Sequence, residues 1–401
     1  MLEHLSCSIE SNEELIVTSS KEIDDLLGTS NSSELEEEEL TDEDDNDIED
    51  IRRPFDPNQI RVATNTKNVD LIIRRIDRDE IDLAPDFQRA EVWTPTKKSR
   101  LIESLLLKIP IPVFYVSADI EDTWSVVDGV QRLSTIHSYM KGEFSLRNLE
   151  YLTEFDGRRF AKLSRPMQRR IEETELLFHV IQPGTPDVVK FNIFTRINTG
   201  GMPLSPQELR HALNPGIARD FLKGLVSTND FVAATGGGMN DTRMGARECA
   251  LRFSAFYPRK WEDYDENDLN SYLNQTMREL NKSSKENLQS IEDAFTRSMR
   301  AAVRIFGNQA FRRPSDRGGL RKPLSKPLFE AWSVNLAQLD PDAIRVLEIK
   351  KSQLIEKFKS ALDDDPWFER SITVSTGTAK SVSIRLQTVR DIIGETLGVF
   401  G

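Results

Sequence analysis

The sequence predicts a mixed α/β domain followed by a mostly helical domain, with a disordered acidic tail in front of both. The first 50 residues hold 19 acidic residues and one basic residue, and they have little apolar surface to bury. Short apolar runs then alternate with helical spacings up to about residue 200, and after residue 201 nearly every apolar pattern has helical spacing. We therefore expect a tail at 1–52, an α/β domain at 53–200 and a helical domain at 201–401.

The net charge of −13 is divided unevenly along the chain. The first 50 residues carry −18, whereas the other 351 carry +5, from 47 acidic and 52 basic residues. A mildly basic body is compatible with nucleic-acid binding, but it is weak evidence when taken alone. No segment approaches the roughly 18 apolar residues of a membrane span, and the first residues lack the pattern of a secretory signal. We expect a cytoplasmic protein with no membrane partner.

Helix start and stop signals delimit the elements of the α/β domain. Thr94-Pro95 joins an N-cap residue to proline at the first helical position, and Pro110 ends the helix that follows. The other expected helices span 68–77, 130–140 and 185–198, and the expected strands span 59–64, 113–116, 124–127 and 176–181.

The helical domain begins with a capping box. Ser205 is the cap residue, and Glu208 occupies the third helical position. Helices are expected at 205–213, 242–257, 266–283, 285–306, 326–338 and 341–362, with a final pair of elements over 371–397.

The strongest candidate for a binding or catalytic site is the segment at Asp128-Gly129, where a strand runs directly into a helix. Glycine lets the backbone approach a ligand closely, and a helix start offers free N–H groups at its positive end. Gln131 and Arg132 lie in the first turn, where arginine can bind phosphate through two hydrogen bonds. Asp128 can bind a metal ion or a ribose hydroxyl. The alternative is an ordinary strand–turn–helix in which Asp128 is only a cap.

Two further segments place an arginine beside an amide near a turn. Gln88-Arg89 precedes the helix at Thr94, and Arg196-Ile197-Asn198 precedes two glycines. Each segment by itself also fits a surface salt bridge or a helix C-cap. Three such clusters in one predicted domain favour a shared pocket.

Three segments resemble, in their order and spacing, the N-terminal domain of GmrSD-type modification-dependent restriction proteins: FQRAEVWTPTKKSRLIESLLLKIPIPVFYV, VVDGVQRLSTI and FNIFTRINTGGMPLSPQELRHAL. A looser resemblance continues through LSKPLFEAWSVNLAQL to SVSIRL, so that it covers about residues 55–400. The resemblance implies a ParB/sulfiredoxin-like fold and a nucleotide-binding, NTP-hydrolysing module that works with DNA restriction or phage defence. The family motif is DGQQR, and Val130 replaces its first glutamine, which leaves hydrolysis more open than binding.

We assign catalytic roles to Asp128, Gln131 and Arg132. Cofactor binding is assigned to Gln88, Arg89, Gly129, Arg196 and Asn198. The implied cofactor is a nucleoside triphosphate of unknown base, with Mg²⁺ as its accompanying ion and with no metal ligands assigned. The implied partners are DNA, a nuclease or other restriction subunit, and a second copy of the chain.

Two other functions stay open: a non-catalytic DNA-binding or regulatory protein that senses nucleotide or modified DNA, and a nuclease that acts through Asp128. The sequence lacks GxxxxGK[ST], so a nucleoside triphosphatase would not be of the P-loop class. No histidine follows His211, so we expect no HNH-type nuclease domain in this chain.

Basic residues cluster in the segments 158–170, 297–304 and 312–326. Such clusters fit DNA phosphates, and they fit an ordinary solvated surface equally well. A flexible acidic tail tethered to them would compete with DNA at low salt, and the alternative is a tail that only promotes solubility.

Overall fold

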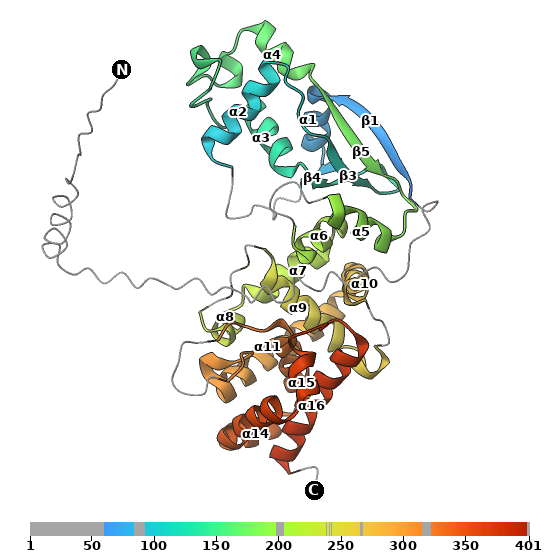
Figure 1. Cartoon of the computed structure of the whole chain (residues 1–401), viewed down its shortest axis with the longest axis vertical. Coiled ribbons are helices and arrows are strands. Elements are labelled where there is room, and N and C mark those ends of the chain that lie inside the picture. The colour runs from blue at the N-terminus through green and yellow to red at the C-terminus, as the bar shows by residue number, and fades with distance from the viewer. Residues whose placement is uncertain are drawn as a thin grey trace, which may run out of the picture. The chain divides into compact units, whose positions relative to one another are not determined.

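In the computed structural model, the described residues are 60–83, 93–197, 204–237, 239, 241, 243–264, 268–314 and 322–398, without the side chains of 187 and 188. All of them belong to one compact unit, Glu38–Gly401. They confirm the predicted fold class, because a mixed α/β region with a five-stranded sheet precedes a mostly helical region (Figure 1). The predicted acidic tail and the predicted boundaries at residues 52 and 200 lie outside the described ranges.

The sheet has the strand order β1-β5-β3-β4-β2. Its strands are β1 (Val62–Asn68), β2 (Ile81–Asp82), β3 (Phe114–Ala118), β4 (Trp124–Asp128) and β5 (Glu175–Ile181). β5 pairs antiparallel with β1 and parallel with β3, and β4 pairs antiparallel with β3 and parallel with β2. The last strand in the sequence is therefore inserted between the first strand and the β3–β4 hairpin.

The two faces of the sheet have different covers. One face packs against α1 (Val69–Asp77), α2 (Pro95–Leu106), α3 (Val130–Met140) and α4 (Arg165–Glu172), and these elements form one apolar cluster. A second, smaller cluster joins β4 and β5 to α5 (Asp187–Ile197) and α6 (Pro206–Leu213). Figure 1 shows α1, α2 and α3 on one side of the strands, with α5 and α6 near the ends of β3 and β4.

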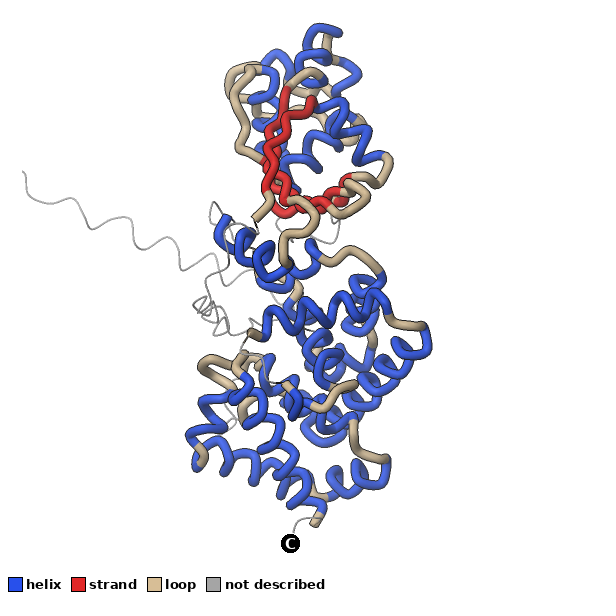
Figure 2. Tube along the Cα trace, turned by 90° about the vertical axis from the view of Figure 1, so that its right-hand side faces the viewer, coloured by secondary structure: helices blue, strands red, loops and turns tan. Residues whose placement is uncertain are grey.

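Ten helices follow α6 in the described residues, and they share one apolar core that runs from Ala218 to Ile393. They are α7 (Ile217–Val226), α8 (Asn229–Thr235), α9 (Gly245–Phe256), α10 (Leu269–Lys282), α11 (Lys285–Phe306), α12 (Lys326–Ala337), α13 (Pro341–Ile349), α14 (Lys351–Asp364), α15 (Pro366–Ser371) and α16 (Ala379–Leu397). Figure 2 shows every described strand within the α/β region and only helices as regular elements beyond it. No helix in the described ranges has the length and apolar character needed to cross a membrane.

Several expectations for the helical region were wrong in detail, and the final pair of elements expected over 371–397 is the single helix α16, which begins at Ala379. The single helix expected at 341–362 breaks at Lys350, and this break allows both α13 and α14 to pack against α16. The short helices α7 and α8 were not predicted. The capping box is confirmed, with the Ser205 hydroxyl accepting from the Glu208 N–H and the Glu208 carboxylate accepting from the Ser205 N–H.

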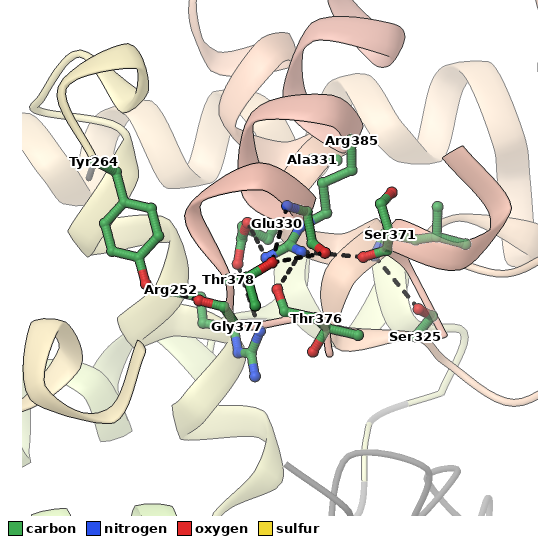
Figure 3. Close-up of polar contacts among 12 residues, drawn as sticks. Arg252, Tyr264, Ser325, Glu330, Ala331, Ser371, Thr376, Gly377, Thr378 and Arg385 are labelled. Carbon is green, nitrogen blue, oxygen red and sulfur yellow. Dashed lines mark hydrogen bonds and ion pairs between the residues drawn. The ribbon is translucent and has the colours of Figure 1, made fainter. Parts of the chain in front are cut away.

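A chain of buried charged side chains runs through the core of the helical region. We call it the charged ladder, and its members are Arg210, Glu248, Arg252, Glu330 and Arg385. The nitrogen–oxygen distances along it are 3.4, 2.9, 3.5 and 2.7 Å. Figure 3 shows its far end, where Arg385 also donates to backbone carbonyls.

The ladder links helices that are distant in the sequence. Burial raises the pKa of Glu248, but the positive charges of Lys326, Arg252 and Arg210 outweigh burial and hold that pKa far below its usual range. Burial lowers the pKa of Arg210 to about 10, so this guanidinium stays charged at neutral pH. The ladder therefore connects α6, at the edge of the sheet, to α16 at the other end of the helical region.

Glu103 on α2 anchors the loop that follows α3. Its buried carboxylate accepts hydrogen bonds from the backbone N–H groups of Glu150, Tyr151 and Leu152 at 3.0, 2.7 and 2.8 Å. Burial raises the pKa of Glu103, but these three bonds outweigh burial and lower the pKa below its usual range. A charged carboxylate is thus part of the folded structure of this loop.

We expect Glu103→Gln to lower the free energy of unfolding by about 1–3 kcal/mol at neutral pH, because an amide cannot accept all three bonds. The folded-state pKa is lowered, so this contribution exists above the unfolded-state pKa and is lost as pH falls through the folded one. Urea unfolding at neutral pH and at about pH 3 measures it. The exposed Glu154→Gln is the control, and a difference from wild type that does not shrink in acid would contradict the prediction.

Candidate functional site

The predicted strand-to-helix junction is confirmed. β4 ends at Asp128, Gly129 adopts the left-handed conformation with φ 99° and ψ 7°, and α3 begins at Val130. A Cβ atom at residue 129 would lie 2.3 Å from Cδ1 of Phe114, so glycine is the residue that fits. Gly129, and not Asp128, is the N-cap residue of α3, and within the described residues no side-chain hydrogen bond caps this helix.

Arg132 is held by four contacts with its own chain. Its guanidinium donates to Oδ2 of Asp128 at 2.8 Å, to the Val113 carbonyl at 3.2 Å and to the Pro112 carbonyl. It also lies over the ring of Phe114, 4.6 Å from the centroid. Burial lowers the pKa of Arg132, and Asp128 opposes this shift. Arg132 therefore fixes the end of β4 and the entry to β3 relative to α3.

The remaining predicted site residues differ in where they lie. Asp128 keeps 39% of its side chain exposed, and Gln131 is half-buried in the first turn of α3. Arg196 lies exposed in the last turn of α5. Gln88, Arg89 and Asn198 lie outside the described residues, so the shared pocket of the three arginine–amide clusters stays a prediction. In the described ranges, no three His, Cys, Asp or Glu side chains are grouped to hold a metal ion.

Sequence analysis missed a row of side chains on the sheet face opposite α1–α4. Thr64, His179 and Tyr115 are direct register partners across β1, β5 and β3, and Tyr115 pairs in turn with Asp128. Thr64 Oγ1 lies 3.2 Å from His179 Nδ1, and the rings of His179 and Tyr115 have centroids 5.2 Å apart. We call Thr64, His179 and Tyr115 the aromatic row, after the two rings that it contains. The sequence does contain a signal for it, because Phe-Tyr-Val at 114–116 and Phe-His-Val at 178–180 repeat one pattern.

In the segments 158–170 and 312–326, some of the described arginines make contacts within the protein. In the segment 158–170, Arg165 pairs with Glu172 at 2.9 Å, and Arg169 pairs with Glu173 at 3.3 Å. Arg312 is buried and donates to backbone carbonyls, so its expected place on a basic surface is wrong.

The remaining basic segment, 297–304, lies on an exposed face of α11. Arg297, Arg300 and Arg304 follow one side of α11, as their spacing predicted, and all three are exposed. Arg300 pairs with Asp230 at 3.0 Å. This face is open to solvent, and so is the basic segment 158–170, where Arg165 and Arg169 keep 64% and 61% of their side chains exposed.

Comparison with known families gives one match. Residues 69–214 match the model of the GmrSD restriction endonuclease N-terminal domain. The matched segment runs from the first residue of α1 to just beyond α6, and it includes the Asp128-Gly129 junction but not β1. Neither the curated proteins nor the solved structures contain a match to the chain. The match covers 146 of the 401 residues, confirms the resemblance over residues 69–214 and suggests a role in DNA restriction or phage defence.

Proposed function

We propose that this domain binds a nucleoside triphosphate at the start of α3 and thereby controls DNA restriction. The observation that supports this proposal most is the left-handed Gly129, an N-cap residue with no side chain of its own, beside the partly exposed carboxylate of Asp128. Free N–H groups at the positive end of a helix favour phosphate, and the family match supplies the link to restriction.

The residues at the junction fit such a ligand in different ways. The backbone N–H groups of Val130 and Gln131 would hold a phosphate oxygen, and Asp128 would bind Mg²⁺ or a ribose hydroxyl. Arg132 would act as a positioning residue, because its guanidinium already bonds to Asp128 and to two carbonyls. A bound triphosphate supplies a phosphoanhydride bond whose hydrolysis releases free energy. Val130 in place of the family's first glutamine makes nucleotide binding the firmer part of the proposal.

We expect Asp128→Asn to weaken binding of the Mg²⁺–nucleotide by about tenfold or more, because a charge-assisted contact is lost. Calorimetric titration with each of the four nucleoside triphosphates measures the affinity. Asp70→Asn is a matched control, since Asp70 also pairs with an arginine four residues on, at 2.7 Å, and is 40% exposed. Equal loss of affinity in both variants would contradict a ligand role for Asp128.

Phosphate release, with and without DNA, separates the remaining functions. Release by the wild type supports a nucleoside triphosphatase, whereas tight binding without release supports the non-catalytic regulatory alternative. If no nucleoside triphosphate binds to the wild type under either condition, the proposed function is overturned.

A further inference from the structure

Two adjacent strands of the sheet present the same short pattern side by side. Phe114 faces Phe178, and Tyr115 faces His179, in the parallel register of β3 and β5. The two phenylalanines are fully buried on the face covered by α1–α4 and stack at 5.0 Å. Because side chains alternate between faces, Tyr115 and His179 lie on the opposite face, where both are half-buried. The inner pair belongs to the core, whereas the outer pair retains exposed ring surface.

The outer pair lies where the helical cover of this face ends. Ile181 and Leu177 are the neighbours of His179 on the same face of β5, two residues away in either direction. Ile181 is 1% exposed beneath α5 and α6, whereas Leu177 is 43% exposed. His179 is oriented by Thr64, whose Oγ1 lies 3.2 Å from Nδ1, and its ring is tilted by 46° to that of Tyr115. The hydrogen bond from Thr64 and the contact between the two rings thus fix the positions of His179 and Tyr115, whose rings remain partly exposed to solvent.

The aromatic row leads directly to the proposed phosphate site. Tyr115 is the register partner of Asp128, the residue that precedes Gly129 and the start of α3. The pairing of β3 with β4 shifts register beside this pair, between Tyr115 and Val116, so that Val127 has no partner of its own on β3. Tyr115 and the start of α3 therefore lie at the same end of the sheet, on either side of the end of β4.

We propose that Tyr115 and His179 form the stacking surface for the base of the nucleoside triphosphate whose phosphates bind at the start of α3, an inference that rests on the proposed function. Aromatic side chains bind nucleobases through their faces, and this interaction tolerates different bases. His179 Nε2, the ring nitrogen that does not face Thr64, is available to hydrogen-bond the edge of the base. Stacking supplies affinity, and this nitrogen supplies a preference among bases.

The test compares ligands that have a base with one that lacks it. The affinities of Tyr115→Leu and His179→Leu are measured by calorimetry for the nucleoside triphosphates and for inorganic tripolyphosphate, all with Mg²⁺. We expect nucleoside triphosphates to bind about 5- to 100-fold more weakly, tripolyphosphate to bind as to wild type, and Tyr115→Phe to keep most of the affinity. Tyr151→Leu is the control, because Tyr151 lies in the same region and is 68% exposed.

The outcomes separate this inference from the proposed function. Wild-type affinity for nucleoside triphosphates in folded Tyr115→Leu and His179→Leu would overturn the stacking surface and leave the phosphate site intact. Equal weakening of tripolyphosphate would also overturn it, since the substitutions would then act on the site as a whole. If a single-stranded oligonucleotide loses affinity but free nucleotides do not, the bound base belongs to DNA and the inference is again overturned. If the wild-type protein binds tripolyphosphate and nucleotides with equal affinity, the base contributes nothing to binding and the inference is overturned.

Discussion

Glu330→Gln is expected to lower the free energy of unfolding by about 3–5 kcal/mol. Glu330 is fully buried, with Oε1 bound to Arg385 at 2.7 Å and Oε2 near Arg252 at 3.5 Å. A neutral amide of the same shape leaves two guanidinium groups buried without their shared counter-charge. The loss is a large part of the stability of a typical domain, and urea unfolding followed by circular dichroism measures it.

Two comparisons isolate the buried charge. Glu395→Gln on α16 removes a carboxylate that pairs with Lys357 at the surface, where it is 51% exposed, and should cost at most about 1 kcal/mol. Glu330→Met combined with Arg385→Met should cost less than the sum of the two single changes, because the pair is removed together. A Glu330→Gln protein as stable as Glu395→Gln would show that the charged ladder does not hold the helices together.

Gly129→Ala is expected to cost about 2–5 kcal/mol. An alanine in the left-handed region is strained by roughly 1–2 kcal/mol, and forcing an extra methyl into a packed contact costs about 1–3 kcal/mol more. The contact is with the Phe114 ring, which is itself held between Phe178 and the guanidinium of Arg132. Thermal unfolding of the purified variant measures the combined effect.

Gly142→Ala and Gly157→Ala separate the two causes. Both glycines have positive φ, 75° and 79°, and a Cβ atom at either would meet nothing within 4 Å. These variants should therefore show the backbone strain alone. If Gly129→Ala lowers the stability no more than Gly142→Ala and Gly157→Ala do, the Phe114 ring can move aside and does not constrain the junction.

The parts of the fold that depend on local sequence could be predicted. Thr94-Pro95 and the Ser205 capping box fix where α2 and α6 begin, because a cap residue acts on N–H groups of its own helix. α11 spans the predicted residues Lys285–Phe306, since a long amphipathic pattern ends there in a glycine. Asp128-Gly129 was recognisable for the same reason, because the turn at Gly129 is set by its own backbone.

The parts that depend on contacts between distant segments could not be predicted. Glu330 and Arg385 are 55 residues apart, and nothing in either helix alone distinguishes them from surface charges. Apart from Asp128, the partners of Arg132 lie about 20 residues earlier, at 112–114, so most of its structural role cannot be recognised from the DG motif. The aromatic row exists because β5 pairs with β3, and that pairing is a property of the sheet order.

The insertion of β5 has a consequence for the order of events on the ribosome. Asn68, the last residue of β1, pairs with Glu175, the first residue of β5, 107 residues later in the chain. At typical rates of synthesis, the edge of β1 has no partner for roughly 5–20 seconds. An unpaired strand edge invites association with other chains, and polar or charged residues on it discourage this. β1 carries such polar and charged residues in Thr64, Thr66 and Lys67. These side chains disfavour aggregation of the nascent strand before β5 is synthesised.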